Sequence, residues 1–222
     1  LKIHLIRAAL TAVMAYLFFF GLTRVPLAQA IGLSFIAPII TLFLAVPILG
    51  ERIGANAKLA AVLGFGGVMV VVGGELLAVD EGSDAVGMAA VLISAVMYAF
   101  NLVLQRMQAL VARPLEIAFY QNTIVFLMML VGVPFAVSWP ASTYQWGGAA
   151  LAAGFAVGSL MLMSLAYRQA EAQRLVVIEY TAFIWAAILG WWFFAEPVTA
   201  RTLLGTGLIV LGCLVSARGG SR

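Results

Sequence analysis

Acidic residues inside apolar segments are the groups of this chain best suited to chemistry. Glu179 lies about two turns inside the apolar segment 172–197, and Glu196 stands near the end of that segment, just before Pro197. A charged side chain at the centre of a membrane helix costs about 2.5–3.5 kcal/mol on the insertion scale, and less near the interface. We therefore expect Glu179 to meet water, a partner or a ligand, and to recognise cationic groups or exchange protons.

Polar side chains also recur at helical spacing inside other apolar segments. Ser94, Tyr98, Asn101 and Gln105 follow one another at steps of three or four residues, so they share one face of a helix. Such a stripe can line a polar path through a membrane. The residues expected to face a substrate cavity are Glu179, Tyr98, Asn101, Gln121, Asn122, Trp185, Ser34 and Thr41.

These residues also have simpler interpretations. Asn101, Gln121 and Asn122 would serve equally well as hydrogen-bonding groups between neighbouring helices, which is a common use of amides in membranes. Trp185 is expected deeper in the bilayer than the two tryptophans that follow it, which are typical of an interfacial belt. Pro38 is expected to kink its helix and to expose a backbone carbonyl there.

The composition indicates a membrane protein. Of the 222 residues, 64% are hydrophobic and 9% are charged, with a mean hydropathy of +1.11, against about 25% charged in soluble domains. The chain has no basic patch for nucleic acid. One Cys and one His make a metal cage unexpected, and we expect no cofactor. Eight crossings are predicted, at 8–23, 26–49, 57–78, 85–106, 114–138, 147–167, 173–195 and 201–217.

The basic residues predict the orientation. Ten Lys and Arg residues fall on one side of the predicted crossings and two, Arg24 and Arg201, fall on the other. Since basic residues are enriched in cytoplasmic loops, both ends of the chain are expected in the cytoplasm. Asp80, Glu81 and Asp84 would then lie in an outer loop.

An internal repeat organises the crossings. Segment 27–51 is an apolar crossing that ends on Glu51, as 172–197 ends near Glu196, where capping or pairing with an adjacent Arg would suffice. Because Glu51 is predicted inside and Glu196 outside, the two copies have opposite orientation, which is typical of transporters. A shift of 145 residues places Glu51 on Glu196, Leu59 on Leu204, Leu63 on Leu208 and Gly67 on Gly212.

Both copies resemble the EamA-type repeats of the drug/metabolite transporter superfamily. The matching residues include Leu49-Gly50-Glu51 and Pro38 in the first copy, and Glu179-Tyr180-Thr181 and Ala195-Glu196 in the second. Phe183 departs from the pattern, which often has a proline there. The resemblance implies two inverted five-helix repeats around a central cavity.

This resemblance divides the chain into two repeats. The first would cover residues 1–79 and lack its first two helices, and the second would cover 84–218 with five helices. We therefore expect an all-α, polytopic helix bundle with eight transmembrane helices of an expected ten. A native eight-helix protein is the alternative.

The function expected is secondary transport of small metabolites across the bacterial inner membrane, as an exporter or exchanger. Amino acids, amines and adenosyl compounds such as S-adenosylmethionine suit an acidic residue among aromatics. Protons or a counter-substrate would drive transport, because no nucleotide-binding loop is present. An uptake permease, a structural or accessory membrane subunit and a homodimer stay open. An enzyme is disfavoured because no nucleophile and base pair is apparent.

The orientation can be tested with topology reporters. A reporter fused after Arg222 should be cytoplasmic, and a tag inserted near Gly82 should be accessible from outside, because the basic residues place these positions on opposite sides. Protease protection and impermeant labelling of intact cells measure both. Two labels on the same side would contradict the predicted orientation.

Overall fold

The chain folds into helices. The computed structural model describes residues 2–25, 27–77, 84–130, 142–194 and 200–218, and every regular element in these ranges is helical, which confirms the all-α fold. The helices are α1 (Lys2–Leu22), α2 (Leu27–Ser34), α3 (Ala37–Leu49), α4 (Ala55–Leu77), α5 (Ala85–Val111), α6 (Pro114–Leu130), α8 (Thr143–Gln169), α9 (Ala172–Glu179), α10 (Thr181–Phe194) and α11 (Ala200–Arg218).

Several of these helices are suited to crossing a bilayer. Within the described ranges, four segments are long and apolar enough: Lys2–Leu22, Ala30–Leu49 (which runs from α2 into α3), Ala85–Val111 and Thr143–Gln169. Shorter apolar helices cover Ala55–Val70, Pro114–Leu130 and Leu203–Val215. Helices satisfy all their backbone polar groups internally, which hydrocarbon demands.

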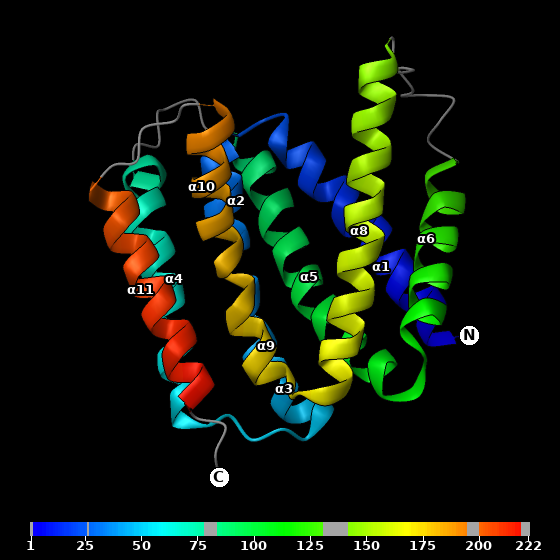
Figure 1. Cartoon of the computed structure of the whole chain (residues 1–222), viewed down its shortest axis with the longest axis horizontal. Helices are drawn as coiled ribbons and strands as arrows, with labels where there is room; N and C mark the ends of the chain where they lie inside the picture. Colours follow the sequence, from blue (N-terminus) through cyan, green and yellow to red (C-terminus); the bar gives the residue numbers. More distant parts are fainter. Residues whose placement is uncertain (1, 26, 78–83, 131–141, 195–199, 219–222) are drawn as a thin grey trace. The chain divides into compact units, whose positions relative to one another are not determined.

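The helices form two compact units. The first contains Leu1–Val13 and Leu104–Ala170, and the second contains Met14–Val103 and Glu171–Arg222. In the first unit, α6 packs on α8. The second unit holds α2, α3, α4, α9, α10 and α11, with α4 packed along α11 (Figure 1). These units divide α1 and α5, and the repeat boundaries at 1–79 and 84–218 stay a prediction.

The predicted crossing at 26–49 consists of two helices. α2 ends at Ser34 and α3 begins at Ala37, with Pro38 in its first turn. A proline ring clashes with the carbonyl four residues earlier, which here belongs to Ser34, so the helix stops where Pro38 would disrupt it. The expected kink at Pro38 is therefore a complete break just before it, and Pro38 opens the second helix.

The predicted crossing at 173–195 is broken as well. α9 ends at Glu179 and α10 begins at Thr181, while the amide of Tyr180 bonds the carbonyl of Val177 in a tighter turn. α9 and α10 continue in nearly the same direction (Figure 1). Both broken crossings start 145 residues apart, at Leu27 and Ala172, and both short first helices have 8 residues.

The two break points pack on each other. The rings of Phe35 and Tyr180 stack at 5.7 Å, and Tyr180 Oη donates to the carbonyl of Phe35 at 3.4 Å. Phe35 and Tyr180 are themselves 145 residues apart. Gly64 of α4 makes room for this stack, because a Cβ there would lie 2.4 Å from the Tyr180 ring.

The α4–α11 crossing has the same two-fold relation. A Cβ on Gly67 would lie 2.5 Å from the carbonyl of Gly205, and a Cβ on Gly212 would lie 2.9 Å from the carbonyl of Ala60. The repeat shift exchanges these two contacts with each other. The paired positions run in opposite directions along the two helices, so α4 and α11 are antiparallel. Small residues allow this close approach, as is common in membranes.

Glu51 holds the start of α9. Gly50 ends α3 with a φ of 69°, a left-handed conformation that suits glycine. The next residue, Glu51, accepts hydrogen bonds from the amides of Ala172 and Gln173 at 3.1 and 3.4 Å. Gln173 Oε1 in turn accepts from the amide of Gly54 at 3.0 Å. A carboxylate thus satisfies the first free amides of α9, where the helix dipole favours negative charge.

Asp84 caps α5 and pairs with Arg24. Its Oδ1 accepts from the amides of Val86 and Gly87 at 2.9 and 3.3 Å, and its Oδ2 accepts from Arg24 Nη1 at 2.8 Å. This contact joins the segment after α1 to the segment before α5 at one end of the second unit. Glu196, Asp80 and Glu81 lie outside the described residues.

Replacing Glu51 should destabilise the protein. Glu51→Ala leaves the first amides of α9 without their acceptor, and losing a helix cap costs about 0.5–2 kcal/mol. Glu51→Gln keeps one oxygen acceptor and should lose less. Thermal unfolding in nanodiscs measures both variants, with Arg52→Ala as the exposed neighbouring control. Equal midpoints for Glu51→Ala and the wild type would refute this role.

The stabilisation that the Asp84 contacts provide should depend on pH. The Arg24 hydrogen bond and then the Val86 amide hold the pKa of Asp84 below its ordinary value of 3.8. A lowered folded pKa means that this stabilisation is complete above about pH 4 and is lost as the pH falls through the folded pKa. Asp84→Asn should therefore lower the thermal midpoint at neutral pH, and the difference from wild type should shrink in acid. A difference that does not change with pH would contradict this.

Candidate functional site

The predicted key carboxylate lies at a break in a membrane segment. Glu179 is the last residue of α9 and is partly buried. Its Oε2 accepts a hydrogen bond from Tyr98 Oη at 2.8 Å. A hydrogen bond to an ionised group is stronger than one between neutral groups. The second unit therefore joins two of the predicted site residues directly, although they stand 81 residues apart.

Packing fixes the position of Tyr98. The residue sits on α5 and packs against two buried clusters of the second unit. One cluster contains Leu42 and Leu102, and the other contains the alanines of α3 and α5 that let these helices approach. Since its ring is held on both sides, Tyr98 presents its hydroxyl to Glu179 in a defined direction.

Glu179 has no basic partner in the described ranges. The salt bridges found there join Arg24 to Asp84 and His4 to Glu116. A carboxylate without a cation in an apolar segment favours a cationic ligand or a proton.

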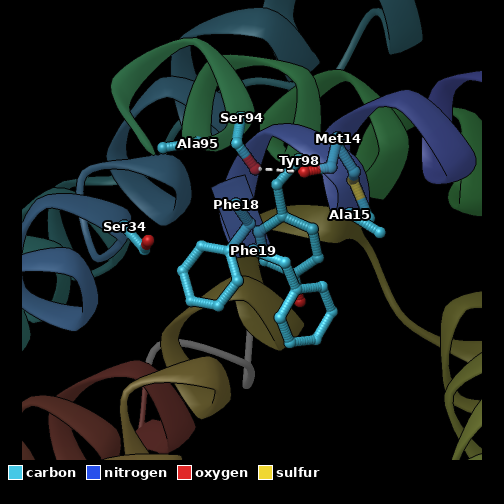
Figure 2. Close-up of a pocket in the computed structure, with 8 residues that line it drawn as sticks. All are labelled: Met14, Ala15, Phe18, Phe19, Ser34, Ser94, Ala95 and Tyr98. Carbon is cyan, nitrogen blue, oxygen red and sulfur yellow. Dashed lines mark hydrogen bonds between the residues drawn. The ribbon is translucent and has the colours of Figure 1, made fainter. Parts of the chain in front are cut away.

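Tyr98 also lines a cavity of the second unit. Its volume is about 330 Å³, which falls at the small end of ordinary ligand sites, roughly 300–1,000 Å³. Figure 2 shows the rings of Phe18, Phe19 and Tyr98 close together, with Ser34 across from them. The lining residues are Met14, Ala15, Phe18, Phe19, Ser34, Ser94, Ala95 and Tyr98.

The hydroxyls on the cavity wall already donate hydrogen bonds. Ser34 Oγ donates to the carbonyl of Ala30 at 2.8 Å, and Ser94 Oγ donates to the carbonyl of Met14 at 2.8 Å (Figure 2). Tyr98 Oη donates to Glu179. The wall therefore presents almost entirely apolar surface to a ligand.

The other predicted site residues have different environments. Thr41 is fully buried, and its hydroxyl contacts the carbonyls of Ala37 at 2.9 Å and Ala99 at 3.4 Å. Asn101 is 5% exposed on α5. Trp185 is 61% exposed and is absent from the cavity wall. Thr41 thus serves helix packing, and Trp185 faces outward in this unit.

Two predicted site residues belong to the first unit. Gln121 is buried, and its Nε2 donates to Thr11 Oγ1 at 2.7 Å, while its Oε1 has no partner among the described residues. Asn122 is exposed and donates to the carbonyl of Ala118 on its own helix at 2.8 Å. The structure therefore does not place Asn122 in a polar network between helices.

The first unit contains a buried polar network that the sequence reading missed. Arg7 Nη1 donates to Gln108 Oε1 at 2.7 Å, and Gln108 Nε2 lies 3.1 Å from His4 Nδ1. All three residues are less than 5% exposed, and His4 Nε2 lies 3.5 Å from Glu116. His4 looks like part of a terminal tail, but α1 already begins at Lys2. The apolar residues on both sides of His4 were the available signal.

The candidate site of the second unit, Glu179 with Tyr98, is suited to binding a ligand. In the described ranges, no group of three or more His, Cys, Asp and Glu side chains could hold a metal ion. Glu179 and Tyr98 can bind a cation or pass a proton, and the aromatic wall can hold an apolar group.

Similar proteins are transporters by name. The chain is 28% identical over 225 residues to the pseudopaline exporter CntI of Pseudomonas aeruginosa, covering 96% of this chain and 74% of that protein. It is 28% identical over 238 residues to a riboflavin transporter of Rhizobium johnstonii, and the match covers 99% of this chain and 71% of that protein. One solved crystal structure shares the fold, with a TM-score of 0.81, 21% identity, and coverage of 99% of this chain and 76% of the other.

The family match agrees with the resemblance seen in the sequence. The EamA-like transporter family, a polytopic helical membrane family, matches residues 1–73 and 85–218, which leaves out little of the chain. The chain belongs to the EamA-like transporter family.

Proposed function

We propose that this protein is a secondary transporter that exports or exchanges small metabolites carrying a cationic group across the bacterial inner membrane. The observation that carries the proposal is the Tyr98–Glu179 hydrogen bond beside an apolar cavity, with no basic residue paired to the carboxylate in the described ranges. Both ends of the chain are taken as cytoplasmic, in line with the basic residues of the sequence.

The carboxylate supports a cationic substrate. In an apolar surrounding, an ammonium or other cation gains a strong contact with Glu179, whereas an anion would be repelled. Amines, amino acids and adenosyl compounds such as S-adenosylmethionine carry a suitable positive group. The names of the relatives, an exporter and a transporter, support transport of small molecules and leave the substrate open.

The same carboxylate suits exchange. A bound cation favours ionised Glu179, and a bound proton removes the charge that attracts the cation. Protons and substrate therefore compete for one group, and such competition couples the movement of one to the movement of the other. A counter-substrate with its own cationic group would compete in the same way.

Removing the carboxylate should weaken transport. Glu179→Gln keeps the shape and a hydrogen-bond acceptor for Tyr98 but loses the charge, so transport of cationic metabolites should fall about tenfold or more and lose its pH dependence. That fall corresponds to the roughly 1.5–3 kcal/mol of a hydrogen bond to a charged group. Uptake and efflux of a panel of metabolites in proteoliposomes, in both orientations, measure the rate and its direction.

Two further variants make the test specific. Tyr98→Phe keeps the ring and removes the donor, so it should change substrate affinity with little loss of folded protein. Glu116→Gln removes a half-exposed carboxylate of the first unit and is the matched control. Transport and a pH profile unchanged in Glu179→Gln would refute the proposed function.

A further inference from the structure

We propose that His4 is a proton-controlled switch in the first unit. The neutral imidazole joins α1 to α5 through Gln108, and the charged imidazole releases Gln108 and pairs with Glu116 of α6. This inference is independent of the proposed function, because it concerns the other compact unit and requires no substrate. It gives a role to the buried polar network of His4, Arg7 and Gln108.

Arg7 determines how the Gln108 amide is oriented. An arginine side chain only donates hydrogen bonds, so the atom of Gln108 that faces it must be the oxygen. Arg7 Nη1 accordingly donates to Gln108 Oε1 at 2.7 Å. The amide nitrogen is then turned to the imidazole, where Gln108 Nε2 lies 3.1 Å from His4 Nδ1. The opposite orientation would place two donors face to face at Arg7.

The amide in turn determines where the imidazole carries its proton. Because Gln108 Nε2 donates, His4 Nδ1 must accept, and a ring nitrogen that accepts carries no hydrogen. The neutral ring therefore carries its single proton on Nε2. That nitrogen lies 3.5 Å from Glu116 Oε1. In this state His4 contacts α5 through one ring nitrogen and α6 through the other.

A second proton on the ring is incompatible with the Gln108 contact. A charged imidazole carries hydrogen on both nitrogens, so its Nδ1–H would meet the amide hydrogens of Gln108. Turning the amide over would bring its oxygen to the ring but would place its hydrogens against Arg7. The hydrogen bond between His4 and Gln108 must therefore break when the ring is charged.

The same proton strengthens the contact with α6. Glu116 then faces a full positive charge, and hydrogen bonds between ionised groups are stronger than those between neutral groups. The Tyr120 ring, whose centre lies 4.8 Å from that of His4, also attracts a cation electrostatically. Both gains belong to α6 and the loss belongs to α5. Protonation thus transfers the polar contact of the first turn of α1 from α5 to α6.

The surroundings of His4 connect the ring to water. The charged and titratable groups that face it in the described ranges are Arg7 on α1 and Glu116 and Tyr120 on α6, while α5 contributes the neutral Gln108. Residue 1, with its amino group, lies outside these ranges. His4 is 4% exposed, whereas 47% of the Glu116 side chain is exposed. Since an ordinary histidine changes charge between about pH 5 and 8, such a switch suits cellular pH.

The single histidine of the chain makes the switch directly observable. His4 is the only histidine among the 222 residues, so the full chain, purified with a histidine-free tag and labelled with nitrogen-15 histidine, gives NMR signals from this ring alone. In nanodiscs at neutral pH we expect a protonated Nε2 and a bare Nδ1. As the pH falls, Nδ1 should gain a proton, and its through-space contact with the Gln108 amide hydrogens should disappear in the same step.

Gln108→Glu should invert the position of the proton. The new carboxylate still accepts from Arg7 but offers its second oxygen to the ring, and this oxygen needs a hydrogen on Nδ1. The ratio of protonated to bare Nδ1 at neutral pH should rise about tenfold or more, as expected for a hydrogen bond to a charged group. Gln145→Glu is the matched control, because it makes the same change at an exposed position of α8 in the same unit. It should leave the ring signals unchanged.

A further variant keeps the test decisive if Gln108→Glu does not fold. Gln108→Met keeps the length of the side chain and removes the amide, so the ring is no longer restricted to a proton on Nε2. The preference for Nε2 over Nδ1 should then fall several-fold at neutral pH. A ring whose preference is unaffected by Gln108→Met would show that the amide does not control the proton.

Three results would overturn the switch. They are a hydrogen on Nδ1 of the wild type at neutral pH, a ring that stays neutral until the protein unfolds in acid, and a charged ring that keeps its Gln108 contact. A bare Nδ1 that gains its proton as the Gln108 contact is lost, with inversion in Gln108→Glu, supports it. None of these measurements involves transport, so a failure of the proposed function leaves the switch in place.

Discussion

A carboxylate inside an apolar segment must be hydrogen-bonded, and the bond from Tyr98 to Glu179 meets this requirement in the second unit. Glu179 is also the last residue of α9, and α10 begins two residues later. The break leaves the carboxylate at a helix terminus, hydrogen-bonded to a tyrosine that also lines an apolar cavity. Tyr98 thus connects the end of α9 with the cavity wall.

The repeat gives this break a counterpart. α2 and α9 begin 145 residues apart, as do α4 and α11. Gly67 and Gly212 exchange places under that shift, and the backbone of the opposite helix packs closely against each of them. Side chains larger than hydrogen at these two positions would push the helices apart, and overpacking of this kind costs about 1–3 kcal/mol. The antiparallel crossing therefore depends on glycine at both equivalent positions.

The sequence predicted the helices better than their breaks and contacts. Long apolar runs sufficed for the crossings, because length and hydropathy are local properties. Pro38 predicted a kink in the crossing 26–49, and the steric clash between its ring and the carbonyl of Ser34 explains why the helix breaks there. Tyr180 carries no such local signal. Glu51 was expected to cap or pair near its own turn, yet it satisfies amides 121 residues away, a contact that only the folded chain can place.

The site shows the same division between local and distant information. The helical spacing of Ser94, Tyr98 and Asn101 predicted that they share one face of a helix, and all three are buried or partly buried on α5. The partner of Tyr98 could not be predicted from helical spacing, because Glu179 lies 81 residues later, in the second of the two chain segments that form this unit. Phe18 and Phe19 resembled ordinary apolar residues of a crossing, and their position around a cavity appears only when α1 lies against α5.

The short helix α9 connects these features. A helix of 8 residues has little stability of its own in water, because nucleation is costly and few bonds are gained. Its position therefore depends on its packing against α3, α4, α10 and α11 and on what holds its two ends: Glu51 at the first amides, and Tyr98 with the Phe35–Tyr180 stack at the last turn. A ligand that takes Glu179 from Tyr98 acts on one of these attachments and leaves the other in place. Recognition at the carboxylate and the placement of a helix are consequently linked through a single hydrogen bond.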